Sequence, residues 1–156
     1  MKILAIDAGV ERTGYAIFKD KELISSGVIL TSKNELIETR LKKIYQTLAK
    51  IIKTYKPQLL VLEKLFYFKN QKTIISVANV QGIILLLAGQ HKIKIEYLTP
   101  LQIKQAITGD GRADKKAIEK ILTIEYQLKK RKYDDEVDAI ACGIAYNLLK
   151  NNKLSG

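Results

Sequence analysis

The chain has 156 residues, 47% of them hydrophobic, and its 27 Lys and Arg against 16 Asp and Glu give a formal net charge of +11 at pH 7. This length supports one well-buried domain and is too short for two comfortable ones, so we expect a single domain over residues 1–156. The single Cys142 excludes an internal disulfide and a cysteine-based zinc site, and the single His91 excludes histidine-rich metal ligation.

The N-terminal part of the chain is typical of an antiparallel meander followed by a helix and a fourth strand. Apolar residues recur at helical spacing from Leu36 to Tyr55, and Pro57 ends that helix before a strand over 58–63. Asp7 lies where a signal peptide would need its apolar region, so we expect a cytoplasmic protein. The meander strands are expected at 2–8, 13–18 and 23–30, joined by turns at 9–14 and 19–21.

The rest of the chain predicts helices around one further strand. A helix is expected from Gln71 to Gln90, and its most apolar stretch, 74–89, is shorter than the ~20 residues that span a bilayer. We therefore expect a buried helix and no membrane association. A basic run, Lys129–Lys132, precedes the last helix, and residues 151–156 have the composition of a flexible tail. The remaining elements are a strand over 93–98, a short helix from Pro100, and helices over 113–126 and 135–150.

This order of elements predicts an α/β fold in which a mixed five-stranded sheet is flanked by helices. The sequence contains no repeat, low-complexity tract or interdomain linker. A crossover helix separates the first strand from the strand over 58–63.

Those two strands each end in a lone carboxylate, Asp7 and Glu63, and a third acidic cluster, 134–138, opens the last helix. A near-continuous apolar strand is usually covered on both faces, so an acid at its end lies beside the core, where an unpaired charge is costly. Three acidic sites in a positively charged chain indicate a phosphodiester hydrolase that holds oxygen-ligated Mg²⁺ or Mn²⁺. The alternative is a structural ion pair with Arg12 or Lys64.

The acidic cluster offers more than one set of ligands. Asp135 and Asp138, at i and i+3, share one helical face, and Asp134, four residues before Asp138, can reach the same face. Spacing alone therefore leaves the choice between Asp134 and Asp135 open. The alternative to a metal site is a helix start, in which an Asp caps the first turn and the acids favour the positive end of the helix dipole.

The excess of positive charge, with a sequence pI near 9.6, favours a polyanionic partner whose binding weakens as salt rises. Nucleic acid is the first candidate, and a Lys-rich surface that only keeps the protein soluble is the alternative. The carboxylates favour nucleic acid, because positive charge around an acidic centre suits a nuclease that holds phosphates and binds metal.

Four groups of residues form an ordered set of motifs: DAGVERTGY at 7–15, EKLF and KN at 63–66 and 69–70, QIKQ and GDGRADK at 102–105 and 109–115, and DEVDAIA at 135–141. In order and spacing they resemble the motifs of the bacterial RuvC family, the Holliday-junction resolvases, whose fold is ribonuclease-H-like. Ala8 replaces the usual Pro of the first motif, and Tyr146 stands where many members have His. A D-x-G element alone also resembles sugar kinases and actin-like ATPases, whereas four motifs in register are specific.

The resemblance implies that four acids hold two Mg²⁺ ions, with Mn²⁺ as a substitute, and its register selects Asp135 over Asp134. Two divalent ions roughly 3.5–4 Å apart can activate a water molecule and stabilise a leaving 3′ oxygen. The resemblance also implies that Lys115 acts in catalysis and that Lys104 and Lys115 contact DNA near the cleaved bond, where solvated surface lysine is the alternative. The implied metal ligands are Asp7, Glu63, Asp135 and Asp138.

Further DNA contacts follow from the same resemblance. Phe66 takes the family position of an aromatic that stacks on an unpaired base, a contact worth ~1–3 kcal/mol per base. Packing in the core is the alternative, and we prefer it for Tyr67 and Phe68. Arg12 and Lys69, inside matched motifs, are expected to contact DNA as well.

The implied activity is resolution of four-way junctions by nicking two opposing strands, leaving 5′-phosphate and 3′-hydroxyl ends, in DNA recombination and repair. Symmetric nicking suits a homodimer, and the apolar residues of helix 71–90 cover more than one face, as an interface there requires. The branch-migration proteins RuvA and RuvB are implied partners. The alternatives are a ribonuclease-H-like nuclease acting on RNA or other branched DNA, a non-catalytic junction-binding module and an ATP-dependent kinase, which the chain length disfavours.

Overall fold

The computed structural model of the chain describes residues 1–64 and 71–154. Its strands are β1 (Lys2–Asp7), β2 (Arg12–Lys19), β3 (Glu22–Leu30), β4 (Leu59–Glu63) and β5 (Lys94–Leu98). Its helices are α1 (Ile37–Tyr55), α2 (Gln71–His91), α3 (Pro100–Thr108), α4 (Lys115–Glu125) and α5 (Asp134–Leu154). Every expected strand and helix is present within a few residues of its expected bounds.

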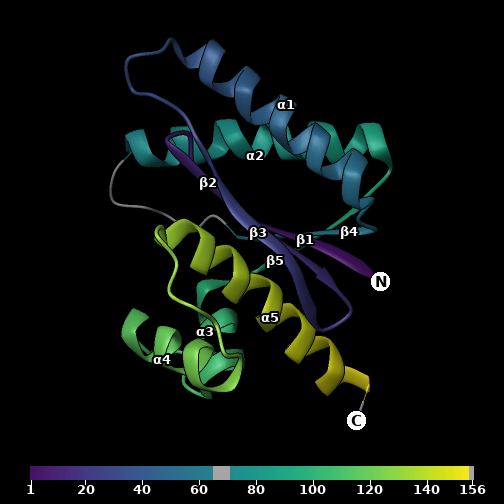
Figure 1. Cartoon of the computed structure of the whole chain (residues 1–156), viewed down its shortest axis with the longest axis vertical. Coiled ribbons are helices and arrows are strands. Elements are labelled where there is room, and N and C mark those ends of the chain that lie inside the picture. Colours follow the sequence, from purple (N-terminus) through teal and green to yellow (C-terminus); the bar gives the residue numbers. More distant parts are fainter. Residues whose placement is uncertain (65–70, 155–156) are drawn as a thin grey trace.

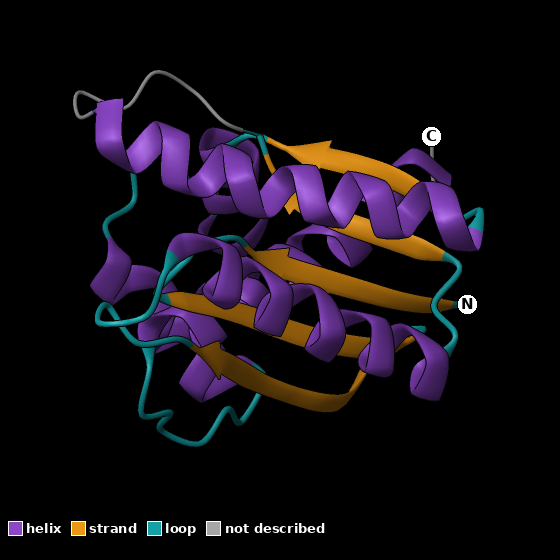
Figure 2. Cartoon of the chain, turned by 90° about the horizontal axis from the view of Figure 1, so that it is seen from above, coloured by secondary structure: helices purple, strands orange, loops and turns teal. Residues whose placement is uncertain are grey.

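The five strands form one mixed sheet in the order β3-β2-β1-β4-β5, which confirms the expected architecture. The meander β1-β2-β3 is antiparallel, whereas β4 and β5 join it in parallel with β1. A parallel neighbour needs a crossover connection, and α1 provides it between β3 and β4. Figure 2 shows the strands side by side beneath helices.

Alternation along the strands divides the apolar residues between two cores, one on each face of the sheet. On β1, Ile3 and Ala5 pack with residues of α3, α4 and α5, whereas Leu4 and Ile6 pack with residues of α1 and α2. Figure 1 shows the two helical layers on opposite sides of the sheet. Because both faces are covered, an acid that ends β1 or β4 lies at the margin of these cores.

Two glycines allow α5 to lie directly on β2. A Cβ atom added at Gly14 of β2 would overlap the backbone carbonyl of Asp135, and one added at Gly143 of α5 would overlap the ring of Phe18. Such overlap with backbone or with a buried ring cannot be relieved by a simple side-chain rotation. The start of α5, with its acids, is therefore held close to β2.

One expectation about a helix end is corrected. Helix α5 continues to Leu154, so residues 151–154 are helical and only 155–156 of the expected tail lie outside the described residues. Leu148 and Leu149 pack against the core and anchor the last turns, and each further residue of a formed helix adds a hydrogen bond.

Helix α2 was expected to be a buried helix with apolar residues on more than one face, and the single chain buries one side of it. Val80, Ile84 and Leu87 are buried, whereas Leu85 and Leu86 are 49% and 55% exposed. A helix packed on one layer can bury only one stripe of its surface. Among the described helices, α2 alone is long and apolar enough to cross a bilayer. Core helices of globular proteins can have the same length and composition.

Candidate active site

Strand pairing brings Asp7 and Glu63 together at one edge of the sheet. The last paired residues of the parallel strands β1 and β4 are Ile6 and Leu62, and each acid follows directly. Both acids continue the alternation of Ile3, Ala5, Leu59 and Val61, so they lie on the α5 face of the sheet. A small hollow of about 60 Å³ is lined by both acids.

The loop between β1 and β2 is shaped by the residues of the first motif. The hydroxyl of Thr13 donates a hydrogen bond to the Gly9 carbonyl at 2.6 Å, and a Cβ at Gly9 would lie 2.6 Å from the Arg12 carbonyl oxygen. Across the strands, Asp7 pairs with Gly14, whose bare face receives the backbone of Asp135. The glycine and threonine residues of the motif thus place the acids of α5 next to Asp7.

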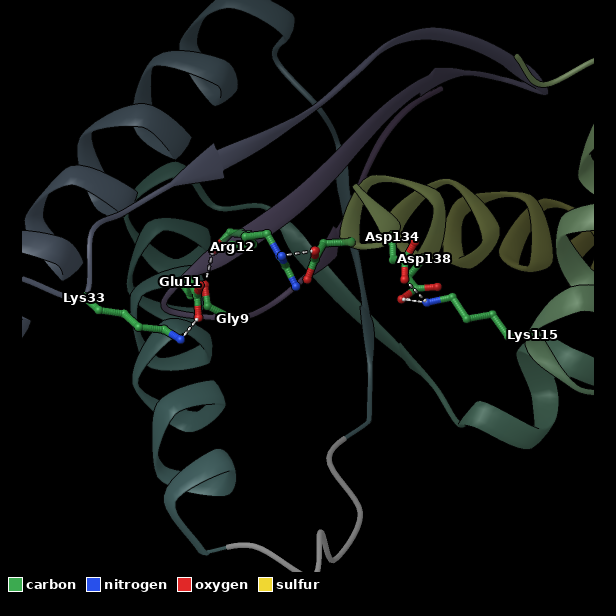
Figure 3. Close-up of polar contacts among 9 residues, drawn as sticks. Gly9, Glu11, Arg12, Lys33, Lys115, Asp134 and Asp138 are labelled. Carbon is green, nitrogen blue, oxygen red and sulfur yellow. Dashed lines mark hydrogen bonds and ion pairs between the residues drawn. The ribbon is translucent and has the colours of Figure 1, made fainter. Parts of the chain in front are cut away.

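Lys115 reaches the same acids from the first position of α4. Asp114 caps this helix by accepting a hydrogen bond from the Ala117 amide at 2.8 Å. The Lys115 Nζ atom lies 3.2 Å from Asp134 Oδ2 and 3.5 Å from Asp138 Oδ2. Figure 3 shows this side chain extending from α4 toward both acids.

A cavity of about 240 Å³ joins these residues to Glu63 and Lys104. Lys104 belongs to α3, which begins with a capping box formed by Thr99 and Gln102. The polar lining consists of Glu63, Lys104, Lys115 and Asp138, and its apolar part consists of Pro100, Ile103, Ile118 and Ala141. Acids from β4 and α5 and lysines from α3 and α4 thus face one hollow at the sheet edge.

Burial and mutual repulsion make these acids reluctant to ionise. Burial raises the pKa of Asp7 from its ordinary 3.8 to about 7, and the neighbouring carboxylates of Asp138, Asp135 and Glu63 add to this effect. Burial is also the main cause that raises the pKa of Glu63 and of Asp138. Burial alone would lower the pKa of Lys115, but Asp138 and Asp134 hold it above its ordinary value. The acids therefore favour a nearby cation.

Arg12 contacts Asp135 and the ring of Tyr133. Its Nε atom lies 2.7 Å from Asp135 Oδ2, and its guanidinium carbon lies 5.9 Å from the centre of the Tyr133 ring. The Asp135 oxygen is buried and accepts no hydrogen bond, because the contact has the distance of an ion pair without hydrogen-bond alignment. The ion pair of Arg12 is thus with Asp135 and not with the strand-ending acids Asp7 and Glu63.

The donor set fits an oxygen-coordinated cation by its chemistry, because it contains several carboxylates and a buried Asp135 oxygen without a hydrogen-bond donor. As the side chains lie, no three or more His, Cys, Asp or Glu residues within 1–64 and 71–154 are close enough to share one ion. Asp135 faces Arg12, and Asp138 faces Lys115. Burial raises the pKa of the Cys142 thiol well above its usual range, so this neighbour remains neutral.

The two candidate acids at the start of α5 differ in exposure. The side chain of Asp134 is 71% exposed, whereas that of Asp135 is 22% exposed. The folded chain therefore distinguishes the two candidate ligands Asp134 and Asp135, because only Asp135 contacts β2 at Gly14. Phe66 and Lys69 lie outside the described residues, and Tyr146, a residue of α5, packs against the core.

One site residue was not foreseen from the sequence. The side-chain amide of Gln81 on α2 donates a hydrogen bond to the Glu63 carbonyl oxygen at 3.2 Å and lines the same hollow as Asp7 and Glu63. In the sequence, Gln81 only interrupts an apolar stretch. A polar residue in an otherwise apolar helix that packs on the sheet was the one available signal.

Known proteins resemble this chain over nearly its whole length. Residues 3–146 match the family model described as crossover junction endodeoxyribonuclease RuvC. Proteins of that name from Fusobacterium nucleatum and Petrotoga mobilis are 42% and 41% identical, over 99% and 100% of this chain and 84% and 99% of their own lengths.

The fold is also found in a solved structure of T. thermophilus RuvC in complex with a Holliday junction substrate. The two structures superpose with a TM-score of 0.88 at 22% identity, over 96% of this chain and 94% of the other. This similarity confirms the ribonuclease-H-like architecture expected from the motifs. By its matched motifs, fold and relatives, the chain belongs to the family of RuvC crossover junction endodeoxyribonucleases.

Proposed function

We propose that the chain is an endodeoxyribonuclease that resolves four-way DNA junctions by metal-dependent nicking of two opposing strands, in recombination and repair. The observation that carries this proposal is the convergence of acids from β1, β4 and α5 at one sheet edge, beside Lys104 and Lys115. Its membership of a family named for crossover-junction cleavage supports the choice of substrate.

In this proposal Asp7, Glu63, Asp135 and Asp138 hold two divalent ions, with Mg²⁺ as the physiological ion and Mn²⁺ as a substitute. Such ions supply an activated water and charge stabilisation at the leaving oxygen of the phosphodiester. The need for them follows from the acids themselves, because burial and mutual repulsion raise the pKa of Asp7 to about 7. Oxygen ligands without Cys or His suit Mg²⁺ and Mn²⁺ rather than zinc.

The lysines serve the DNA in this mechanism. Lys115, placed by the Asp114 cap at the cavity, neutralises charge on the cleaved phosphate as it develops in the transition state. Lys104, which lines the same cavity, orients the strand by its phosphate. Arg12, Phe66 and Lys69 are further proposed DNA contacts, of which only Arg12 lies in the described part of the chain.

We further propose a homodimer that uses an exposed stripe of α2. Residues Ile75, Ala78, Gly82, Leu85 and Leu86 form this α2 stripe at helical spacing, and all are exposed in the single chain. The side chains of Ile75, Leu85 and Leu86 are 61%, 49% and 55% exposed. Large apolar side chains exposed together on one surface are typical of a protein–protein interface. A two-fold pair of active sites would cut opposing strands symmetrically.

RuvA and RuvB are the proposed partners, and the cytoplasm is the proposed location.

Cleavage of a panel of substrates tests the proposed activity. We expect paired, symmetric nicks in a mobile four-way DNA junction, with 5′-phosphate and 3′-hydroxyl ends that a ligase seals, and no cutting of a linear duplex of the same sequence. Cleavage of an RNA–DNA hybrid or of simpler branched DNA at an equal rate would favour the more general nuclease. Tight junction binding without any nick in Mg²⁺ or Mn²⁺ would favour a binding module.

A further inference from the structure

The basic run Lys129–Lys132 does not lie wholly free on the surface. Arg131 turns toward α5, where its Nε atom lies 3.4 Å from Glu136 Oε1, and its side chain is 30% exposed. The same Nε atom is buried and donates no hydrogen bond, so the contact is one of charge. Lys132 instead lies over the Tyr133 ring, with its ammonium nitrogen 5.2 Å from the ring centre.

Glu136 is held from two sides at the start of α5. The hydroxyl of Ser26, on β3, donates a hydrogen bond of 2.6 Å to Glu136 Oε1, the oxygen that Arg131 approaches. Only 14% of the Glu136 side chain is exposed. A carboxylate that is nearly buried needs both a hydrogen bond and a counter-charge, and Ser26 and Arg131 provide one of each.

The position of Glu136 on the helix gives this contact a consequence for the acidic centre. Successive residues of an α-helix point about 100° apart, so Glu136 points away from the helical face that Asp135 and Asp138 share. Asp135 meets Arg12, Glu136 meets Ser26, and Asp138 meets Lys115. The bond to Ser26 therefore fixes the rotation of the turn about its own axis, while Gly14 fixes its distance from β2.

We propose that Glu136 is a positioning residue: its hydrogen bond to Ser26 of β3 orients the first turn of α5 so that Asp135 and Asp138 present their carboxylates to the metal ions. Arg131 compensates the charge of Glu136 and thereby links the basic run Lys129–Lys132 to the first turn of α5. The inference rests on the proposed metal-dependent function. Ser26 and Arg131 lie outside the four motifs, and Glu136 lies inside the motif at 135–141 without having been assigned to metal ligation or DNA contact.

Mn²⁺ affinity, measured by electron paramagnetic resonance of the free ion, separates positioning from charge. We expect Glu136→Ala to weaken Mn²⁺ binding about tenfold, the lower end of the loss when a group that orients metal ligands is removed. Glu136→Gln keeps an oxygen that accepts from Ser26 and should remain within about twofold of the unchanged protein. Glu38→Ala is the matched control, because Glu38 is an exposed acid in the first turn of another helix, α1.

The outcomes are distinct. Equal Mn²⁺ affinity of Glu136→Ala and the unchanged protein, or an equal loss in Glu136→Gln and Glu136→Ala, would overturn the inference, the second because it indicates charge alone. If Glu136→Ala does not fold, Ser26→Ala decides, with a loss of several-fold supporting the positioning role and unchanged affinity refuting it. Failure of the proposed function would instead be seen in the unchanged protein, which would bind no Mn²⁺. Asp138→Asn would then show the same lack of Mn²⁺ binding.

Discussion

Asp7 is a carboxyl group whose surroundings penalise its charged form. Burial raises its pKa to about 7, and three further acids act in the same direction, whereas Lys115 opposes them. A group whose pKa is raised by folding binds protons more readily in the folded state, so the folded chain loses stability as pH rises from about 4 to about 7. The site is thus a place where metal binding and folding stability are coupled.

The first prediction concerns this coupling. In the absence of divalent metal, Asp7→Asn should raise the free energy of unfolding at pH 8 by on the order of 2–4 kcal/mol, and the difference should vanish below pH 4. Urea denaturation at several pH values measures it. Asp20→Asn is the control of opposite sign, because hydrogen bonding to the N-terminal ammonium lowers the pKa of Asp20. A pH-independent effect of Asp7→Asn would contradict the assigned surroundings.

The second prediction concerns Lys115, the cation that faces both Asp134 and Asp138. Lys115→Met should slow single-turnover junction nicking about 10²-fold, as expected when a group that stabilises transition-state charge is removed. The adjacent and exposed Lys116 provides the control, and Lys116→Met should nick at the unchanged rate. Equal rates for the two variants would assign Lys115 to the solvated surface.

At the scale of elements, the active site depends on how closely α5 approaches the sheet. Gly14 is the point of contact, because any side chain there would overlap the backbone of Asp135. Gly143 plays the same part further along the helix, where it receives the ring of Phe18. Small residues at these two places let a helix carry its first acids to within reach of acids that end two strands.

The third prediction follows from that contact. Gly14→Ala should lower the free energy of unfolding by about 1–3 kcal/mol through overpacking and weaken Mn²⁺ binding, because the first turn of α5 must move away from Asp7. Thermal denaturation and Mn²⁺ titration measure the two effects. Gly89→Ala is the control, since a Cβ at Gly89 meets no atom within 4 Å. It should leave stability unchanged or raise it by up to about 1 kcal/mol. Unchanged Mn²⁺ affinity in Gly14→Ala would contradict the role given to this contact.

The sequence predicted the elements well because its apolar periods are strong, and Asp7 and Glu63 became candidates for the site because both end apolar strands. Local pattern could not predict the parallel register that places these acids side by side. The resemblance of the motifs to a known family implied that the acids act together. The ion-pair partner of Arg12 could not be predicted from the sequence either. Asp135 lies far along the chain from Arg12, and their contact depends on the docking of α5, which no local pattern encodes.

The same limit explains what was missed or misjudged. The bond between Ser26 and Glu136 joins residues 110 positions apart, and Gln81 bonds to a backbone carbonyl, which has no sequence signature. The expected tail at 151–156 was judged from polar composition, whereas the end of α5 is held by Leu148 and Leu149 one turn earlier. Local composition describes a segment's surface preference but not the packing that extends a helix.

At the scale of the whole molecule, the exposed α2 stripe and the net charge of +11 concern partners rather than folding. The fourth prediction is that the chain sediments as a dimer at low micromolar concentration and that Leu85→Glu with Leu86→Glu makes it a monomer. The control is Ile124→Glu, since Ile124 on α4 is 64% exposed and lies outside the α2 stripe. A monomeric unchanged protein, or a dimer that survives both changes in α2, would contradict this interface.

The central claim is that one set of carboxylates makes this chain a metal-dependent junction nuclease. It is tested most directly by measuring binding and nicking of a mobile four-way DNA junction, in Mg²⁺ and in Mn²⁺, for the unchanged protein and for Asp7→Asn. We predict nicking that requires the metal and is lost in Asp7→Asn while junction binding persists. Metal-dependent nicking by Asp7→Asn at the unchanged rate would contradict the claim.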